Sequence, residues 1–462
     1  MDMTGKMLRR LGEQLPGCVS IPGSDRYAAA TAIWAKPVGP KPRAVVQCRT
    51  AVDVQSAIRA AREADLALSV RGGGHDWAGR ALYGQLVIDL SAMNGTLIAA
   101  DNRSARIAGG ASASDVLGVT DPHGLAAVTG SCGAVGMTGF TLGGGYGPCI
   151  GRFGLALDNL LAAEVVLADG RIVTASDSSE PELFWALRGG GGNFGVVTAM
   201  HHRLHELPSI WSGMLLFPFA EAKAVLEGCA AIAASAPDEL TVQLGILVGP
   251  DGSPMVMIVP TWCGPPEQGE ARVAPFLKLG TVLVSTVAAM SCKDRLGIFA
   301  PHIVNGQRVF METSWLPSID SRSVDAMIHA MAGAVSPGCV ILTHAFTGAA
   351  SRVPVETTAF GVRSDHVLVE ILATFPDRSD SLEEQRHRQW ARCARQGFDA
   401  MALPGGYPNL LGSGDGERAA KAYGRNAKRL IDAKRLYDPA NVFWSAIPLP
   451  DQPSNRQGNT RS

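Results

Sequence analysis

The chain has 462 residues, of which 46% are hydrophobic and 18% are charged, and its formal net charge is −1. This length suffices for two or three domains, and the composition is that of a folded globular protein. The balanced charge and the scattered basic residues argue against a nucleic-acid or membrane-surface partner, and no apolar run approaches the ~20 residues of a membrane span.

Nine cysteines are scattered along the chain without any Cys-x-x-Cys spacing, so neither a disulfide framework nor a zinc site is expected. The N-terminal stretch contains the basic pair Arg9-Arg10 but no apolar segment behind it, unlike a secretory signal. We therefore expect a cytoplasmic protein.

The first predicted elements follow the order strand, helix, strand. Residues 44–48 and 66–70 form apolar runs, and between them Thr50 can cap a helix with an apolar stripe. The stripe consists of Val54, Ala57, Ile58 and Ala61. A crossover of this kind predicts a parallel pair of strands.

Further strands are predicted before Pro208. One covers residues 86–90, and another region, residues 97–109, is broken by a turn at residues 101–104. Residues 164–167 and 171–174 flank Asp169-Gly170, which predicts a hairpin.

After Pro208, strands alternate with longer amphipathic helices, which predicts an antiparallel sheet covered on one side. The strands are expected at residues 211–219, 241–248, 254–262, 340–346 and 366–375, and the helices at residues 220–236, 318–335 and 381–401. A helix over residues 417–435 follows, and the polar residues 451–462 predict a disordered tail.

Two glycine-rich motifs each contain one reactive side chain. The first is Arg71-Gly-Gly-Gly-His75-Asp-Trp77, and the second is Gly130-Ser-Cys132-Gly-Ala-Val135-Gly136. Glycine allows backbone amides to approach a large planar or anionic ligand, and both imidazole and thiolate can bond an electrophilic ring. Together the motifs indicate a flavin held by two covalent links. Alternatively, each motif is a tight turn with a buried side chain.

Seven segments in order resemble the bacterial members of the berberine-bridge-enzyme-like FAD-linked oxidases, within the vanillyl-alcohol-oxidase superfamily. The resemblance extends from about Lys41 to about Phe443. The segments are residues 71–81, 86–91, 130–147, 151–159, 182–198, 406–409 and 437–443.

The resemblance implies an α+β, two-domain PCMH-type FAD-binding fold with a split flavin domain. Residues 1–207 would form the first part of this domain, and residues 404–450 would rejoin it. Residues 208–403 would form the substrate domain, an antiparallel sheet covered by helices.

The resemblance also implies how FAD is held. His75 would bond the flavin 8α-methyl group, and Cys132 would bond C6, although Gly133 replaces the proline usual after this cysteine. The amides of residues 71–74 would hold the pyrophosphate. The expected FAD-binding residues are Arg71, Gly72, Gly73, Gly74, His75, Asp76, Cys132, Val135, Gly136, Thr138, Gly139, Gly143, Gly144, Tyr146, Gly147, Asn193, Val197, Tyr407 and Asn409.

The expected catalytic residues, from the same resemblance and from strand spacing, are Tyr407, Val135 and Glu370. Val135 would leave room for dioxygen, as valine accompanies oxidases and leucine dehydrogenases in this family; ordinary packing is the alternative. Tyr407, in a Tyr-x-Asn motif, would accept the substrate proton with Arg363 as a candidate neighbour. Glu370 and His366 share a strand face that either roofs the site or faces solvent.

Two other patterns are rejected as sites. The sequence Gly190-Gly-Gly-Asn193-Phe-Gly195 has dinucleotide-loop spacing, but a helix is predicted before it and a strand after it, the reverse of a nicotinamide site. His201, His202 and His205 lack a metalloprotease pattern, and no metal is expected. The segment Trp444-Ser-Ala departs from the family, so its contacts cannot be inferred from the resemblance.

The expected function is that of an FAD-dependent oxidase. It would take hydride from an alcohol, sugar, amine or natural-product intermediate and reduce dioxygen to hydrogen peroxide. The alternatives are an FAD dehydrogenase or oxidative cyclase of secondary metabolism that uses another acceptor, and a non-catalytic flavin-binding protein.

Overall fold

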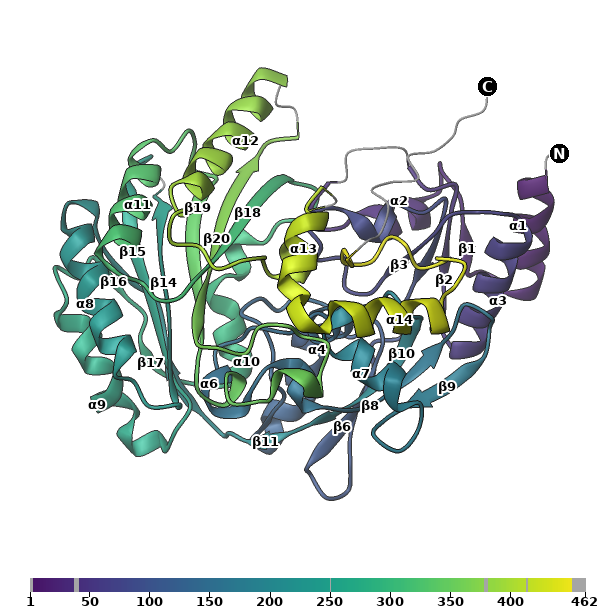
Figure 1. The fold of residues 1–462 in the computed structure, drawn as a ribbon, viewed down its shortest axis with the longest axis horizontal. Coiled ribbons are helices and arrows are strands. Elements are labelled where there is room, and N and C mark those ends of the chain that lie inside the picture. Colours follow the sequence, from purple (N-terminus) through teal and green to yellow (C-terminus); the bar gives the residue numbers. More distant parts are fainter. Residues whose placement is uncertain (1–2, 37–40, 250, 378–380, 413, 451–462) are drawn as a thin grey trace.

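The computed structural model describes residues 3–36, 41–249, 251–377, 381–412 and 414–450. Three larger β-sheets organise these residues, with two sheets in one lobe and the third in the other (Figure 1). The predicted tail, residues 451–462, lies outside the described residues. Within the described part of the chain, no helix combines the length and apolarity that crossing a membrane requires.

The N-terminal sheet has the strand order β1-β2-β4-β3 and packs against three helices. Its elements are α1 (Met3–Gln14), β1 (Val19–Ser20), α2 (Asp25–Thr31), β2 (Ala44–Gln47), α3 (Ala51–Glu63), β3 (Leu68–Arg71) and β4 (Leu86–Asp89). The predicted cap of α3 is confirmed, because the Thr50 hydroxyl accepts from Asp53 N–H at 3.2 Å.

The predicted pairing of β2 with β3 was wrong in one respect. The two strands are parallel, but β4 lies between them and pairs with both. A strand-helix-strand pattern predicts that its two strands run parallel. It does not exclude a later strand from pairing between them.

The second sheet is antiparallel and has the order β5-β6-β10-β8-β9. The predicted hairpin is confirmed by the pairing of β8 with β9. The elements of this region are β5 (Thr96–Ile98), β6 (Ser104–Ala108), α4 (Ala113–Thr120), β7 (Leu125–Ala126), α5 (Met137–Leu142), α6 (Ile150–Phe153), β8 (Leu160–Val166), β9 (Ile172–Ala175), α7 (Pro181–Gly190), β10 (Val196–Arg203) and β11 (His205–Glu206).

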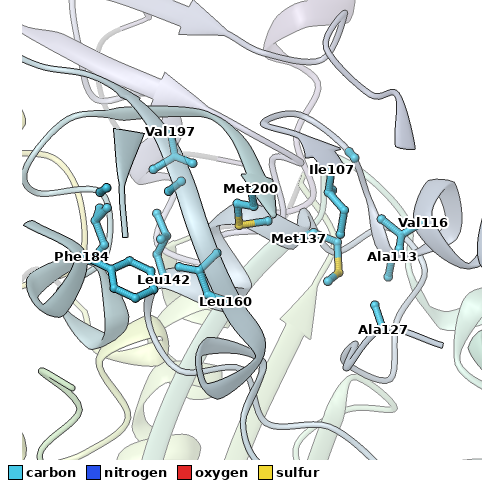
Figure 2. Close-up of a cluster of buried hydrophobic side chains, with 14 of the residues drawn as sticks. Ile107, Ala113, Val116, Ala127, Met137, Leu142, Leu160, Phe184, Val197 and Met200 are labelled. Atoms are coloured by element: carbon cyan, nitrogen blue, oxygen red, sulfur yellow. The ribbon is translucent and has the colours of Figure 1, made fainter. Parts of the chain in front are cut away.

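A buried apolar cluster on this sheet anchors α5 (Figure 2). Met137 and Leu142 of α5 pack with Ile107, Met200 and Phe184 from β6, β10 and α7. Because α5 starts directly after Gly136, the core fixes the position of the glycine-rich loop that contains Cys132.

The third sheet is antiparallel and has nine strands, seven of which follow the order β16-β13-β15-β14-β19-β20-β18. Its strands are β12 (Ile210–Ser212), β13 (Leu215–Pro218), β14 (Leu240–Val248), β15 (Pro254–Trp262), β16 (Val284–Ser285), β17 (Ala288–Met290), β18 (Arg308–Leu316), β19 (Cys339–Phe346) and β20 (His366–Phe375). Its helices are α8 (Ala222–Ala234), α9 (Gly269–Val273), α10 (Cys292–Arg295), α11 (Ser321–Ala332) and α12 (Ser381–Gln396). As predicted, α8, α11 and α12 cover one face (Figure 1).

The C-terminal region contains two helices where one was predicted. They are α13 (Gly416–Tyr423) and α14 (Ala427–Tyr437), and Gly424 between them has a φ of +49°. The apolar pattern continues across this turn, which explains the error. Helix α14 packs on α7 of the first lobe (Figure 1). The domain boundaries at residues 207 and 403 stay a prediction.

Candidate active site

A cavity of about 770 Å³ lies between the glycine-rich loops and the third sheet. Residues 72–76, 130–132, 135 and 136 line one side, and side chains of β14, β15, β18, β19 and β20 line the other. Cavities that bind cofactors and small molecules typically measure ~300 to 1,000 Å³. The size therefore suits a large organic cofactor.

The two glycine motifs touch each other. A Cβ atom placed on Gly73 would lie 2.4 Å from the Gly136 nitrogen, and one placed on Gly136 would lie 2.4 Å from the Gly73 nitrogen. Only glycine allows the two backbones to approach this closely. As a result, the loops that contain His75 and Cys132 form one continuous wall.

His75 is held as a neutral imidazole. Its ring stacks on Trp34 with the centroids 4.4 Å apart, and within the described residues its buried Nδ1 atom has no hydrogen-bond partner. Burial lowers the pKa of His75 to about 4, against the opposing effect of the Asp76 and Glu370 carboxylates. A neutral imidazole nitrogen retains the lone pair that a covalent bond requires.

Cys132 is half-buried at the same wall. Burial raises the pKa of its thiol, while the backbone N–H groups of Ala134 and Val135 act in the opposite direction. At Gly133, where the family usually has proline, Ser114 N donates to the backbone oxygen at 3.0 Å. The Ser114 hydroxyl also occupies the space that a Cβ at position 133 would need.

Most of the predicted FAD-binding residues line the cavity. They are Gly72, Gly73, Gly74, His75, Asp76, Cys132, Val135, Gly136, Thr138, Gly139, Tyr146, Val197, Tyr407 and Asn409. The predicted oxygen-gating residue Val135 is among them, half-buried and open to the cavity.

Five other predicted residues lie behind the lining and support it. They are Arg71, Gly143, Gly144, Gly147 and Asn193. Arg71 Nη1 donates to Ala30 O at 2.9 Å, and a Cβ on Gly147 would overlap Thr129 O at 2.1 Å. These residues shape the loops, and their contact with FAD stays a prediction.

Tyr407 has two hydrogen-bond donors directed at its hydroxyl oxygen. Gly145 N donates at 2.8 Å and Asn409 Nδ2 at 2.9 Å. Both donors favour a phenolate, but burial outweighs them and raises the pKa of Tyr407 to about 12. Arg363, the expected neighbour, forms a buried bidentate ion pair with Asp158 at 2.8 and 2.9 Å, and among the described residues it makes no hydrogen bond to Tyr407.

Glu370 and His366 belong to the face of β20 that borders the site. Glu370 lines the cavity and pairs with His344 at 3.2 Å. His366 is buried, and its Nε2 lies 2.6 Å from the Tyr146 hydroxyl while Nδ1 lies 2.7 Å from Ser364 O. Since Nδ1 must donate to the carbonyl, Nε2 accepts from Tyr146, and His366 thereby orients a cavity-lining ring. The solvent-facing alternative was wrong.

Several other lining residues are hard to predict from the sequence. Trp34 lies outside any motif, and Met311 belongs to the unpredicted strand β18. Arg80 donates to Asn409 O at 2.7 Å and to Asp76, so it joins the His75 loop to the Tyr407 loop. The divergent C-terminal segment also lines the cavity, through Ser445, Ala446 and Ile447.

The rejected patterns have structural roles. The loop of residues 190–195 follows helix α7 and precedes strand β10, as predicted, and its Gly191, Gly192 and Gly195 line the cavity. His202 Nε2 lies 3.1 Å from Ala156 O, and His205 Nε2 lies 2.8 Å from Asn159 Oδ1.

Comparisons with known proteins agree with this geometry. The family model described as "FAD binding domain" matches residues 42–176, and the model described as "Berberine and berberine like" matches residues 401–450. The chain is 30% identical to (R)-6-hydroxynicotine oxidase of Paenarthrobacter nicotinovorans, over 96% of this chain and 98% of that protein. It is 28% identical to an FAD-linked oxidoreductase of Gibberella zeae, over 91% and 83% of the two chains.

Solved structures share the fold. The crystal structure of 6-hydroxy-D-nicotine oxidase from Arthrobacter nicotinovorans has a TM-score of 0.85 at 28% identity, and the match covers 95% of this chain and 98% of that one. A chitooligosaccharide oxidase has a TM-score of 0.84 at 21% identity, covering 98% and 100% of the two chains.

The fold and the glycine-lined cavity are those of an FAD-linked oxidoreductase, and the chain belongs to the berberine-bridge-enzyme-like family. The protein is therefore an enzyme that uses FAD and acts on a small molecule. The predicted α+β FAD-binding fold is confirmed.

Proposed function

We propose that the protein is an oxidase whose FAD is bonded to both His75 and Cys132. The proposal is supported above all by one observation: the two side chains line the same glycine-walled cavity, on loops that touch at Gly73 and Gly136. The buried Nδ1 of His75, which has no partner among the described residues, suits a covalent bond to the cofactor. When bound, FAD would supply the redox chemistry, in which two electrons leave the substrate as hydride and are passed on to dioxygen, giving hydrogen peroxide.

The substrate proton has two candidate acceptors. Tyr407 carries two hydrogen-bond donors at its oxygen, but burial keeps it protonated at neutral pH unless a ligand stabilises the phenolate. Glu370 faces the cavity as a carboxylate paired with His344. We propose Tyr407 as the general base, with Glu370 as the alternative that its position supports.

The substrate-facing wall favours an apolar molecule with an amine or alcohol group. Met257, Met311, Leu342 and Leu372 line this wall, and the Glu370–His344 pair adds a polar group to it. Apolar walls with few polar groups bind ligands mainly by burial, and the polar groups set orientation. An amine would match both the carboxylate and the oxidase named in the 30% identical relative.

Dioxygen is the proposed acceptor because Val135 lines the cavity and is partly exposed there. A shorter side chain leaves more room for a small molecule than leucine would. A dehydrogenase or oxidative cyclase that uses another acceptor is the alternative. We also propose a cytoplasmic location, since all nine cysteines are free thiols in the structure.

Covalent attachment is tested by intact-mass measurement of the purified yellow protein. The wild type should exceed the 48.4 kDa polypeptide by one FAD, and colour should remain with acid-precipitated protein. His75→Ala and Cys132→Ala should each keep one bond, and only the double variant should release FAD on denaturation. Cys393→Ala, at an exposed cysteine, is the matched control and should behave as wild type.

Release of FAD from denatured wild type would contradict both bonds. Release from one single variant alone would assign the only bond to the residue that this variant lacks.

A further inference from the structure

Arg295, the last residue of α10, is a buried cation without a protein counter-charge. The residue is only 3% exposed, and its Nε donates to Thr261 Oγ1 at 3.1 Å. Its Nη1 atom is buried and has no hydrogen-bond partner among the described residues. A guanidinium has five N–H donors and no acceptor, so this environment leaves donors unused.

The other buried arginines of the described structure are each paired with a carboxylate. Arg80 Nε donates to Asp76 at 3.0 Å, and Arg363 binds Asp158 through two hydrogen bonds. In the part of the chain that the structure describes, no carboxylate lies at salt-bridge distance from Arg295. A buried charge is costly unless an opposite charge adjoins it, so an anion from solution would stabilise Arg295.

A small cavity lies against this guanidinium. It measures about 20 Å³, and Arg295 lines it together with mainly apolar residues, among them Val128, Phe153, Ile210 and Leu296. One water molecule needs ~10 to 15 Å³ of such space. The cavity therefore has room for a single water molecule or a single ion of slightly larger size, and it is too small for a polyatomic ligand.

The lining favours an anion over a water molecule. Among the described lining residues, the only side-chain oxygen is the Thr129 hydroxyl, which donates to Gly130 O at 3.2 Å. The side chains thus offer the strong donors of Arg295 but almost no strong acceptor. A water molecule has two hydrogens of its own to donate, whereas a halide ion only accepts hydrogen bonds.

We propose that this cavity binds one chloride ion, which serves as the counter-ion of Arg295. The size of the cavity selects a monatomic anion. Its apolar walls favour an ion that gives up its hydration shell easily, which makes bromide a suitable probe. The proposal is independent of the oxidase function, because it involves neither the flavin nor the substrate.

The position of the cavity connects chloride to the loop that contains Cys132. Gly130 lines both the small cavity and the large one. Leu296, next to Arg295, lies against the same loop, since a Cβ atom placed on Gly133 would be 3.7 Å from the Leu296 Cβ. A bound chloride should therefore stabilise the packing of this loop against the end of α10.

Thermal unfolding of the wild-type holoenzyme tests whether halide binds. Its melting temperature is measured with increasing sodium chloride or sodium bromide, and sodium gluconate keeps the ionic strength constant so that charge screening does not change. A ligand that binds only the folded state stabilises it increasingly as its concentration exceeds Kd. Both halides should raise the melting temperature by a few degrees relative to gluconate, which is too large for the cavity. No rise with either halide would overturn the proposal.

A variant tests whether Arg295 is the residue that binds the ion. Arg295→Gln removes the positive charge but keeps a side chain that can form hydrogen bonds, and it should lose the halide response. Lys223→Gln is the control, because Lys223 belongs to an exposed ion pair with Asp325 and its loss should leave the response unchanged. A halide response in Arg295→Gln equal to that of wild type would refute the assignment to Arg295.

A second measurement does not depend on the stability of a variant. Wild-type crystals soaked in sodium bromide should show an anomalous diffraction peak in the small cavity, within hydrogen-bond distance of Arg295 Nη1. A water molecule at this position, without a bromide peak, would overturn the proposal. Since neither measurement uses turnover, failure of the proposed oxidase function would not affect these results.

Discussion

Tyr407 shows how burial and hydrogen bonding compete at one oxygen. Gly145 and Asn409 both donate to it, yet the pKa rises to about 12. A phenolate base is active only when deprotonated, so a step that depends on Tyr407 should accelerate as pH rises toward that pKa. Tyr407→Phe should slow anaerobic flavin reduction by ~10²- to 10⁴-fold and abolish this rise.

The matched comparison for the base is Glu370→Gln, which keeps the size of the side chain and removes the carboxylate. Stopped-flow reduction of both variants across pH distinguishes the candidates. If Tyr407→Phe keeps the wild-type rate and pH profile of flavin reduction while Glu370→Gln is slow, Glu370 is the general base.

Val135 is tested by reoxidation of the reduced enzyme in air. Val135→Leu adds bulk at the cavity wall and should slow reoxidation several-fold, while anaerobic reduction by substrate stays near wild type. Val135→Ala, which adds no bulk, is the control and should reoxidise normally. Slow reoxidation of the wild type itself would favour the dehydrogenase alternative.

At the level of elements, the sequence predicted structure where the signal was local. The Thr50 cap of α3 and the β8–β9 hairpin depend on neighbouring residues, and both are present. Strand β18 was missed because most of its residues are buried on both faces, so the alternation that marks a half-buried strand is absent. The turn at Gly424 was missed because the apolar pattern runs through it.

The buried ion pair between Asp158 and Arg363 connects η3 (Ala156–Asn159), before β8, to the segment before β20. Both side chains are at most 10% exposed, and Arg363 also donates to Ala350 O at 3.1 Å. Asp158→Asn would leave the guanidinium buried without its counter-charge, which typically costs ~3 to 5 kcal/mol. Urea unfolding should show a lower midpoint with little change in slope.

The control for this pair is Asp325→Asn, at a surface pair in which Lys223 and Asp325 are both more than half exposed. Its urea midpoint should stay close to that of wild type, because solvent screens such pairs. Equal shifts of the urea midpoint in Asp158→Asn and Asp325→Asn would contradict the claim that burial makes the Asp158–Arg363 pair costly to break.

Over the whole molecule, the site combines segments that no local pattern connects. The motifs predicted many of the residues that line the cavity, because glycine runs and reactive side chains are visible in the sequence itself. They did not show that Trp34 would stack on His75 or that Arg80 would join two loops 329 residues apart. Those contacts follow from tertiary packing between segments that are far apart in the sequence.

Because both lobes line one cavity, cofactor binding should stabilise the whole fold. In wild type with two covalent bonds, added FAD should not change the melting temperature. In the His75→Ala/Cys132→Ala variant, FAD would bind reversibly, and saturation at ~100 times Kd would add about 2.7 kcal/mol of stability. The melting temperature of that variant should therefore rise with added FAD, and riboflavin should raise it less, since it lacks the pyrophosphate that the amides of residues 71–74 are predicted to hold. A wild-type melting temperature that rises with added FAD would show that the cofactor is not covalently held.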